Sequence, residues 1–306
     1  MPTDLPMLTV AAAHARYEAI RPRLPEIRRV GAPRTARNLL ETADHYDGYL
    51  FDSFGVLNVG DRAIPGAAEC LVSLRALGKP FCILTNAASY TSKAALSKYH
   101  RLGLDVRQEE IVSSRDVLFS HLRDSGSSLS WAAICAEEDA FEDATAPVVD
   151  LLADERHWDR AEGFMFLSSA RWTQALQDRL VDALRQRPRP VTVGNPDLVA
   201  PREGGLTIEP GYWAHDLEDR TGIKPAFYGK PYRDAFLAGA QRLALLNASG
   251  PRIAMVGDTL HTDILGGQAA GLDTILVTDH GIYAGQSLHG FVTGSKIDPT
   301  WTIPSI

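Results

Sequence analysis

Short apolar segments alternate with helix-like segments along most of this chain, and this alternation restricts the fold more than any other feature. Residues 49–52 (YLFD), 80–86 (PFCILTN) and 252–258 (RIAMVGD) are continuously apolar up to a polar end, which is typical of strands covered on both faces. Segments with helical spacing, such as IPGAAECLVSLRALGKP and SYTSKAALSKYHRLGL, lie between them. Strands and helices in this order form βαβ units, so the sequence predicts an α/β protein with a Rossmann-like parallel sheet.

A second α/β block interrupts this pattern. Residues 112–205 contain strand-like segments such as SWAAICAEE and a helix-like segment, ARWTQALQDRLVDALRQRP, which is enough for an inserted domain. We therefore predict a core made of residues 46–111 and 206–306. Residues 1–45 are predicted to be a helical extension that either packs on the core or mediates formation of a homodimer. The Gly- and Pro-rich tail from His280 is predicted to lie extended over the surface.

Composition excludes several classes of function. The chain of 306 residues has a formal net charge of −7, so a basic footprint for nucleic acid is not expected. No apolar run approaches the length of a membrane span, and the N-terminal segment lacks the pattern of a signal peptide. The three cysteines show no CxxC spacing and are expected to be reduced core residues. We expect a soluble cytoplasmic protein with no nucleic-acid or membrane partner.

Polar side chains follow three of the predicted strands. Asp52 ends the first, Thr85 and Asn86 end the second, and Asp258 ends the C-terminal one, with Asp263 five residues later. Ligands of open parallel sheets bind outside the carboxyl ends of the strands, so we expect these side chains to lie together. A strand-terminal Asp alone often serves only as a helix cap or turn former, but three converging strand ends favour a functional site.

Three neighbouring carboxylates require a cation. At about 4 Å and an effective dielectric near 20, each like-charged pair costs about 4 kcal/mol. Mg²⁺ takes oxygen ligands and is often shared with a substrate phosphate, so the sequence predicts a magnesium site. Lys230, in the loop segment YGKP, is a second candidate counter-charge, although a solvated surface lysine is the alternative interpretation.

The segments FDSFGVL, ILTNAAS, YGKP and GDTLHTDILGG together resemble the four motifs of the haloacid dehalogenase-like (HAD) hydrolase superfamily. The resemblance is to the NagD/4-nitrophenylphosphatase group, and GNPDLVAP is similar to a further signature of that group. It covers residues 46–285 and implies a HAD core with an α/β cap inserted between the second and third motifs, as the block at 112–205 would be.

The resemblance also implies roles for individual residues. Asp52 would be the nucleophile that forms an aspartyl-phosphate. Thr85 would hydrogen-bond the transferring phosphoryl group near the Asn86 backbone, and Lys230 would neutralise Asp52 and the phosphoryl oxygens. Phosphoryl transfer needs mainly such positioning and charge neutralisation.

The implied metal ligands are the Asp52 carboxylate, the Phe54 main-chain carbonyl and Asp258, with Asp263 as a further ligand or as a supporting partner. Asn195 and Asp197, in the GNPDLVAP segment, either face the substrate or only form a Pro-containing turn.

Phe54 departs from the pattern of the phosphatases that the chain resembles, which usually have Asp at this position. That Asp protonates the leaving oxygen and then activates water, and general acid–base catalysis contributes about 10²–10⁴-fold in rate. His261 could replace the missing acid, or it could be a solvated loop histidine. Haloacid dehalogenases have an aromatic residue here but lack the metal-binding carboxylates.

The sequence therefore predicts a Mg²⁺-dependent phosphatase of a small phosphorylated metabolite that is slow because of Phe54. Two alternatives stay open. One is a weakly active or inactive relative that senses a phosphorylated ligand. The other is a hydrolase of a substrate with a good leaving group, such as a haloacid.

Overall fold

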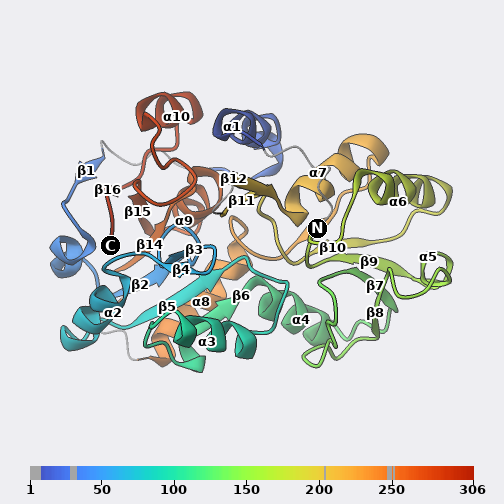
Figure 1. Ribbon diagram of the computed structural model, residues 1–306, viewed down its shortest axis with the longest axis horizontal. Helices are drawn as coiled ribbons and strands as arrows, with labels where there is room; N and C mark the ends of the chain where they lie inside the picture. The colour runs from blue at the N-terminus through green and yellow to red at the C-terminus, as the bar shows by residue number, and fades with distance from the viewer. Residues whose placement is uncertain (1–7, 28–32, 203–204, 247–249, 251) are drawn as a thin grey trace.

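The computed structural model describes residues 8–27, 33–202, 205–246, 250 and 252–306. Two parallel sheets lie at the centres of two halves, with the first on the left and the second on the right of Figure 1. The larger sheet has seven strands in the order β1-β16-β15-β14-β2-β5-β6, and the smaller has five in the order β13-β10-β9-β7-β8. The predicted α/β class with a Rossmann-like parallel-sheet core is thus confirmed.

The larger sheet consists of β1 (Arg34–Thr35), β2 (Gly48–Phe51), β5 (Phe81–Thr85), β6 (Ile111–Ser113), β14 (Ile253–Gly257), β15 (Asp273–Val277) and β16 (Trp301–Ile303). The smaller sheet consists of β7 (Trp131–Ile134), β8 (Val148–Asp150), β9 (Gly163–Phe166), β10 (Val191–Val193) and β13 (Ala226–Phe227). Two antiparallel hairpins complete the strands: β3 (Asn58–Val59) with β4 (Arg62–Ala63), and β11 (Val199–Arg202) with β12 (Gly205–Ile208).

The helices are α1 (Val10–Ala19), α2 (Ala67–Ala76), α3 (Ser92–Arg101), α4 (Ser114–Asp124), α5 (His157–Arg160), α6 (Gln174–Gln186), α7 (Pro210–Thr221), α8 (Arg233–Leu245), α9 (Leu265–Ala269) and α10 (Leu288–Ser295). Short 3₁₀ segments lie at Arg21–Arg23, Leu39–His45 and Gln108–Glu110, and a π-helical segment, Leu260–Ile264, leads into α9.

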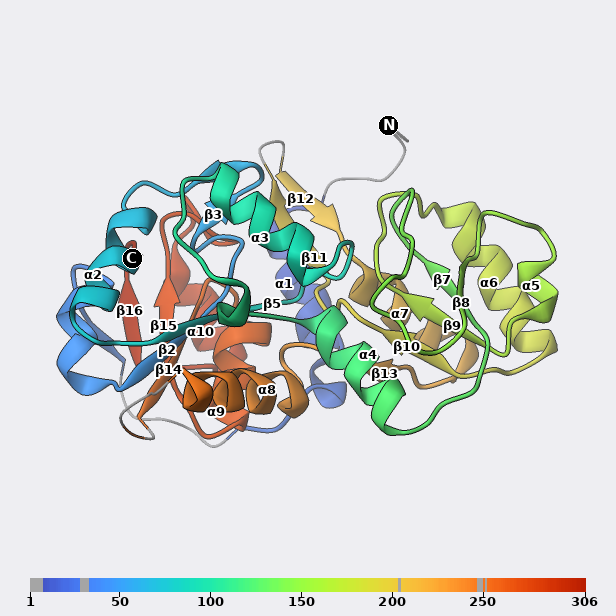
Figure 2. The same cartoon turned by 90° about the horizontal axis from the view of Figure 1, so that it is seen from below.

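Helices cover both faces of the larger sheet, which explains its continuously apolar strands. Figure 2 shows α2 and α3 on one side of this sheet and α8 and α9 on the other. Along β2, Tyr49 and Phe51 belong to the apolar cluster that includes residues of α2, while Leu50 belongs to the cluster that includes Phe236 of α8. Successive side chains of one strand therefore fill two separate cores.

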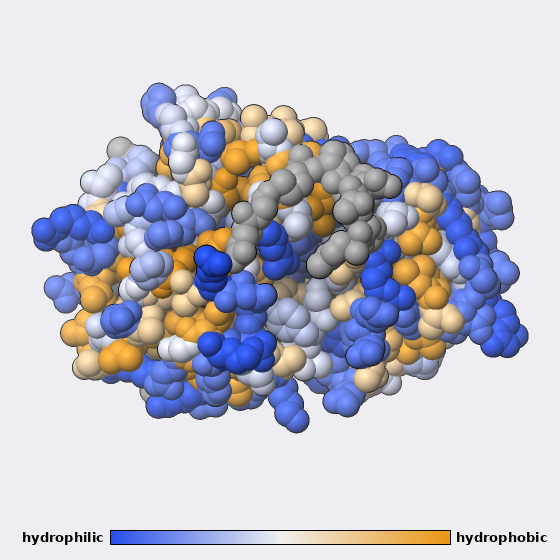
Figure 3. Space-filling view, in the orientation of Figure 1, coloured by the Kyte–Doolittle hydropathy of each residue, from blue (hydrophilic) through white to orange (hydrophobic). Residues whose placement is uncertain are grey.

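The smaller sheet is also covered on both faces. Phe164 and Phe166 of β9 pack in a cluster with residues of α6 and α7, whereas Met165 packs in a cluster with Leu118 and Leu122 of α4. Hydrophilic residues cover the outer margin of this half in Figure 3.

Two predicted features of the chain differ from the structure. The tail from His280 was predicted to be extended over the surface, but it forms α10 and then β16, a buried strand between β1 and β15. That prediction was wrong because β16 is only three residues long and is followed by Pro304, so its sequence gives little strand signal. The N-terminal segment, predicted to be helical, also contributes the edge strand β1 to the larger sheet.

The predicted end of the inserted block, residue 205, lies too early for the smaller sheet. Both α7 and β13 follow this position, and β13 pairs in parallel with β10 through Phe227. A strand of only two residues has no recognisable periodicity, so the sequence could not locate it. In the described parts of the chain, no helix has the length and apolarity needed to cross a membrane.

Candidate functional site

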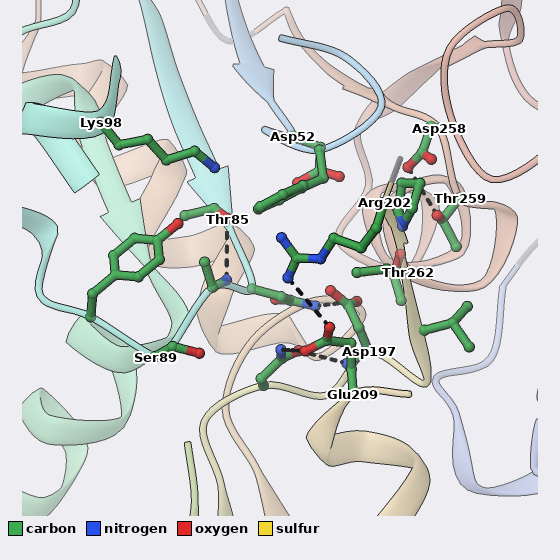
Figure 4. A pocket seen from close by; sticks show the side chains of 18 of the residues that line it. Asp52, Thr85, Ser89, Lys98, Asp197, Arg202, Glu209, Asp258, Thr259 and Thr262 are labelled. Atoms are coloured by element: carbon green, nitrogen blue, oxygen red, sulfur yellow. Dashed lines mark hydrogen bonds and ion pairs between the residues drawn. The ribbon is translucent and has the colours of Figure 1, made fainter. Parts of the chain in front are cut away.

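A cavity of about 310 Å³ opens at the carboxyl ends of β2, β5 and β14, beside the β11–β12 hairpin. Seven of the residues singled out from the sequence line it, namely Asp52, Phe54, Thr85, Asn86, Asn195, Asp197 and Asp258. Figure 4 shows several of these side chains converging on one space from different elements. The parallel sheet thus places polar residues distant in sequence at one edge.

Asp52 follows β2 directly and lies at the edge of the cavity. Its Oδ1 accepts a hydrogen bond of 2.7 Å from the backbone N of Ser53 and lies 2.7 Å from Lys230 Nζ. Its side chain is 14% exposed, and no described residue donates a hydrogen bond to Oδ2. One carboxylate oxygen is thus fixed, while the other is available to a ligand.

Lys230 is buried between two carboxylates. Its Nζ lies 2.6 Å from Asp263 Oδ1 in addition to its contact with Asp52. Burial alone would lower the pKa of Lys230, but the negative charges of Asp263, Asp52 and Asp197 outweigh this and raise it above its usual value. Lys230 is therefore a permanent positive charge inside the site, and not the solvated surface lysine of the alternative interpretation.

Asp263 supports Lys230 from below the cavity. It does not line the cavity, and its side chain is fully buried. Its Oδ1 accepts from Lys230 and its Oδ2 accepts from the backbone N of Thr259 at 3.0 Å. Burial raises the pKa of Asp263 to about 6, against the opposing effect of Lys230.

Asp258 is a buried carboxylate whose oxygens face donors from its own loop and from the segment after β15. Oδ1 accepts from Thr259 Oγ1 at 2.9 Å, and Oδ2 accepts from the backbone N of Ile282 at 2.7 Å. Burial, followed by the charges of Asp263 and Asp52, raises the pKa of Asp258 well above its usual value. An uncompensated carboxylate is thus held in an environment that opposes its charge.

Gly55 lets the turn after Asp52 approach Asp258 closely. It has a φ of +81°, and a Cβ at this position would lie 2.4 Å from Asp258 Oδ2. A side chain here would meet both backbone strain and a steric clash. The turn therefore brings the backbone around Phe54 towards the carboxylates.

The carboxylates of Asp52, Asp258 and Asp263 fit a divalent cation. One oxygen of each lies within 4.8 Å of the others, and the only lysine ion-paired with any of them in the described chain is Lys230. Three carboxylates and one ammonium leave a deficit of two positive charges when all are ionised. Oxygen donors with this charge suit Mg²⁺.

Asn86 connects the end of β5 to the Lys230 loop and to Asp197. Its Oδ1 accepts from the backbone N of Lys230 at 2.8 Å, and its Nδ2 donates to Asp197 Oδ1 and to the Lys230 carbonyl, each at 2.8 Å. Burial raises the pKa of Asp197 to about 8, although the positive charge of Lys230 acts in the opposite direction. The Asn86 side chain is fully engaged in holding these two segments together.

Asn195 forms the turn that leads to Asp197. Its Oδ1 accepts from the backbone N of Asp197, and its Nδ2 donates to Glu209 Oε2 at 3.2 Å.

Thr85 Oγ1 accepts from the backbone N of Ala87 at 3.2 Å, which leaves its hydroxyl proton free to donate into the cavity that it lines.

The Phe54 side chain lies between two cations. Lys98 Nζ is 4.0 Å from the centroid of its ring, and Arg202 Cζ is 4.8 Å from it. Sequence reasoning did not identify either cation. Lys98 lies on α3, where a lysine is normally expected on the solvent-exposed face of the helix. Arg202 lies at the end of the hairpin strand β11, where the sequence gives no sign of a site.

His261 lies away from the cavity. Its Nε2 is 2.5 Å from Glu18 Oε1 of α1, and its ring stacks on Tyr17 with centroids 4.8 Å apart. It is fully buried rather than solvated, and it does not line the cavity. The structure therefore supports neither of the two interpretations of this histidine.

Two family models match this chain. The model described as haloacid dehalogenase-like hydrolase matches residues 49–145, and a second, described as HAD-hydrolase-like, matches residues 227–306. The matched segments include the strand-end residues Asp52, Thr85 and Asp258 and the loop residue Lys230.

Individual proteins are similar over most of the chain. An acid sugar phosphatase of Staphylococcus aureus is 26% identical over 265 residues, which cover 85% of this chain and 95% of that protein. A crystal structure described as a possible sugar phosphatase of the HAD superfamily, from Cytophaga hutchinsonii, has a TM-score of 0.76 and 25% identity and covers 90% of this chain and 98% of its own. NagD from Escherichia coli K-12 has a TM-score of 0.64 and is 24% identical. The match covers 85% of this chain and 96% of the NagD chain, which shows a shared fold.

Proposed function

We propose that the chain, which two haloacid dehalogenase-like hydrolase models match and which shares its fold with NagD, is a Mg²⁺-dependent phosphatase of a small phosphorylated metabolite. The observation that carries this proposal is the contact of Asp52 with Lys230 at the edge of a cavity also lined by Asp258. The acid sugar phosphatase that the chain resembles supports phosphate esters as the substrate class.

Asp52, Asp258 and the Phe54 carbonyl are the proposed ligands of Mg²⁺. Asp52 and Asp258 line the cavity, whereas Asp263 does not line it and is ion-paired with Lys230, so we assign Asp263 the role of holding Lys230 and supporting the ion. When bound, Mg²⁺ would offset the carboxylate charges and neutralise developing charge on the phosphoryl oxygens.

In the proposed reaction, Asp52 Oδ2 attacks phosphorus and the bond to the ester oxygen breaks, giving an aspartyl-phosphate and an alkoxide or aryloxide that takes its proton from solvent water. Oδ1 stays paired with Lys230 at 2.7 Å, so the attacking carboxylate is oriented before the ester binds. Water then attacks the aspartyl-phosphate, which releases inorganic phosphate and restores Asp52.

Thr85 and Lys230 are the proposed contacts of the transferring phosphoryl group. The Thr85 hydroxyl would donate to one phosphoryl oxygen, and the Lys230 charge would stabilise the others. Asn86 supports this arrangement by fixing the Lys230 loop through three hydrogen bonds. Asn195 and Asp197 are proposed to face the alcohol part of the substrate from the junction with the second sheet.

Phe54 is proposed to make this phosphatase slow. Its apolar ring can neither protonate the leaving oxygen nor activate water, and general acid–base catalysis contributes about 10²–10⁴-fold. Esters with acidic leaving groups are least affected, because their oxygen leaves without a proton. Phe54 also favours the second candidate function, a sensor that binds a phosphorylated ligand, because a site without this acid can bind the ester and hydrolyse it little or not at all.

Turnover of p-nitrophenyl phosphate separates these two functions. We expect phosphate release with Mg²⁺, loss of release with EDTA, and loss in the Asp52→Asn variant. Saturable phosphate-ester binding without release would favour the sensor. Metal-independent release of halide from haloacids, with none of phosphate, would favour the dehalogenase alternative.

A further inference from the structure

Lys98 reaches the cavity without an anionic partner among the residues that the structure describes. The residue is only 9% exposed, and its ammonium makes no hydrogen bond or ion pair with any other described residue. Figure 4 shows its side chain extending from α3 towards the middle of the cavity. A buried ammonium is unfavourable unless a negative group faces it, and the aromatic ring of Phe54 is only a weak substitute.

Arg202 approaches the same ring from β11. Its guanidinium lies 3.6 Å from Glu209 Oε1, with no shorter ion pair to any residue that the structure describes, and its side chain remains 42% exposed. Lys98 and Arg202 thus bring two positive charges from two different structural units to one aromatic residue. Such cations repel each other unless an anion lies near both.

The lining of the cavity carries both signs of charge. It includes three cations, Lys98, Arg101 and Arg202, and besides the strand-end carboxylates of Asp52 and Asp258 it includes Asp61, Asp197 and Glu209. Among these described carboxylates, none forms an ion pair with Lys98. Strongly hydrophilic residues also gather near the middle of the face in Figure 3, between the two halves.

We propose that Lys98 and Arg202 form a second anion subsite, so that the substrate is a phosphate monoester whose alcohol part carries a carboxylate or a second phosphate. This inference rests on the proposed phosphatase function, because that function places the transferring phosphoryl group at Asp52. The alcohol part lies along the Phe54 ring, and its acidic group reaches the two cations. The bound anion also links α3 to the β11–β12 hairpin.

The test compares esters that differ only in the second charge. Alkyl phosphates of two to four carbons are compared with carboxyalkyl phosphates of the same number of carbons, beginning with ethyl phosphate against phosphoglycolate. They are also compared with the α,ω-bisphosphates of diols of the same number of carbons. We expect kcat/KM to favour the doubly anionic ester at one or more chain lengths by at least about tenfold, the effect of one charge-assisted hydrogen bond. Preference for the carboxylates or for the bisphosphates identifies the anion, and equal values throughout both series would overturn the proposal.

Variants of Lys98 assign the effect to this residue. Lys98→Met should reduce the preference at least about tenfold, and Lys98→Arg should retain most of it. Lys93→Met is the matched control, since Lys93 is an exposed lysine on the same helix that does not line the cavity. A preference that persists in Lys98→Met, or that falls equally in Lys93→Met, would contradict the assignment.

A binding measurement separates this inference from the proposed function. Calorimetry with the Asp52→Asn variant in Mg²⁺ measures the affinity for each pair of esters without turnover. If wild-type protein released phosphate from no ester, the proposed function would fail, but tighter binding of the doubly anionic ester, lost on adding Lys98→Met, would still support the subsite. Equal affinities for both members of every pair would overturn it.

Discussion

Lys230 Nζ lies 2.7 Å from Asp52 Oδ1, and the same ammonium lies 2.6 Å from Asp263, so a single buried lysine is the shared counter-charge of two carboxylates. Asp258, the third carboxylate, has backbone and hydroxyl donors but no ion pair with a described lysine or arginine. The side chains of the site are thus held in place before any ligand binds, and the negative charge of Asp258 is the one that a bound cation would balance.

Removal of Lys230 should destabilise the protein strongly. Lys230→Met leaves the buried Asp263 and the partly exposed Asp52 without their partner, and breaking a buried ion pair such as the one with Asp263 costs about 3–5 kcal/mol. Urea unfolding in EDTA measures the change in the free energy of unfolding. Lys224→Met, at an exposed lysine nearby in sequence, should change it by less than about 0.5 kcal/mol. Equal effects of the two substitutions would show that Lys230 is not a structural counter-charge.

Asp197→Asn should stabilise the metal-free protein increasingly as pH rises. Burial raises the pKa of Asp197 to about 8, and the nearby charges of Asp52 and Asp263 add to this shift, while Lys230 opposes it. A carboxyl group with a raised folded-state pKa favours folding most when protonated, and that contribution is lost as pH rises from about 4 to about 8.

An amide has no such loss, so the stability of the variant relative to the wild type should be greater at pH 8 than at pH 5. Chemical denaturation at both pH values in EDTA measures this difference. A difference that stays constant, or that changes in favour of the wild type as pH rises, would mean that Asp197 is ionised in the folded protein at neutral pH.

Mg²⁺ should raise the melting temperature, and Asp258→Asn should remove most of this increase. A ligand that binds only the folded state stabilises it by about 2.7 kcal/mol at one hundred times its Kd. Asp61→Asn is the control, because Asp61 lines the same cavity but is absent from the carboxylate cluster. A Mg²⁺-dependent shift that survives in Asp258→Asn and disappears in Asp61→Asn would place the ion elsewhere.

Phe54→Asp should increase the turnover of alkyl phosphates more than that of aryl phosphates. The new carboxyl group would restore an acid for leaving oxygens that need a proton, with a maximum gain of about 10²–10⁴-fold. Ion pairs with Lys98 and Arg202, which contact the present ring, should make the actual gain smaller. Phe54→Leu controls for the change in volume, and an equal gain on both ester types would show that proton donation is not the missing step.

The strand-end residues were predictable because sheet topology alone determines their convergence. Asp52, Thr85 and Asp258 each end a buried apolar strand, and neighbouring parallel strands in the order β14-β2-β5 bring those ends together. Lys230 was predictable from its loop and from the need for positive charge. These inferences required only strand direction, which the alternation of strands and helices provides.

Other features depend on tertiary contacts that leave no periodic signal. Lys98 occupies an ordinary position on a polar helix, and only the packing of α3 against the cavity buries it. The burial of His261 depends on α1, which contributes Glu18 and Tyr17 from more than two hundred residues away in sequence. Short strands such as β13 and β16 acquire their identity from the neighbours with which they pair.

The most direct test of the central claim is to identify the residue that carries the phosphoryl group during turnover. Because Phe54 cannot activate water, hydrolysis of the intermediate should be slow, and the aspartyl-phosphate should accumulate. Acid quenching during turnover of p-nitrophenyl phosphate with Mg²⁺, followed by peptide mass spectrometry, should find one phosphoryl group on Asp52 and none in the Asp52→Asn variant, which should also have lost turnover. A phosphoryl group on another residue, or undiminished turnover in Asp52→Asn, would contradict the account.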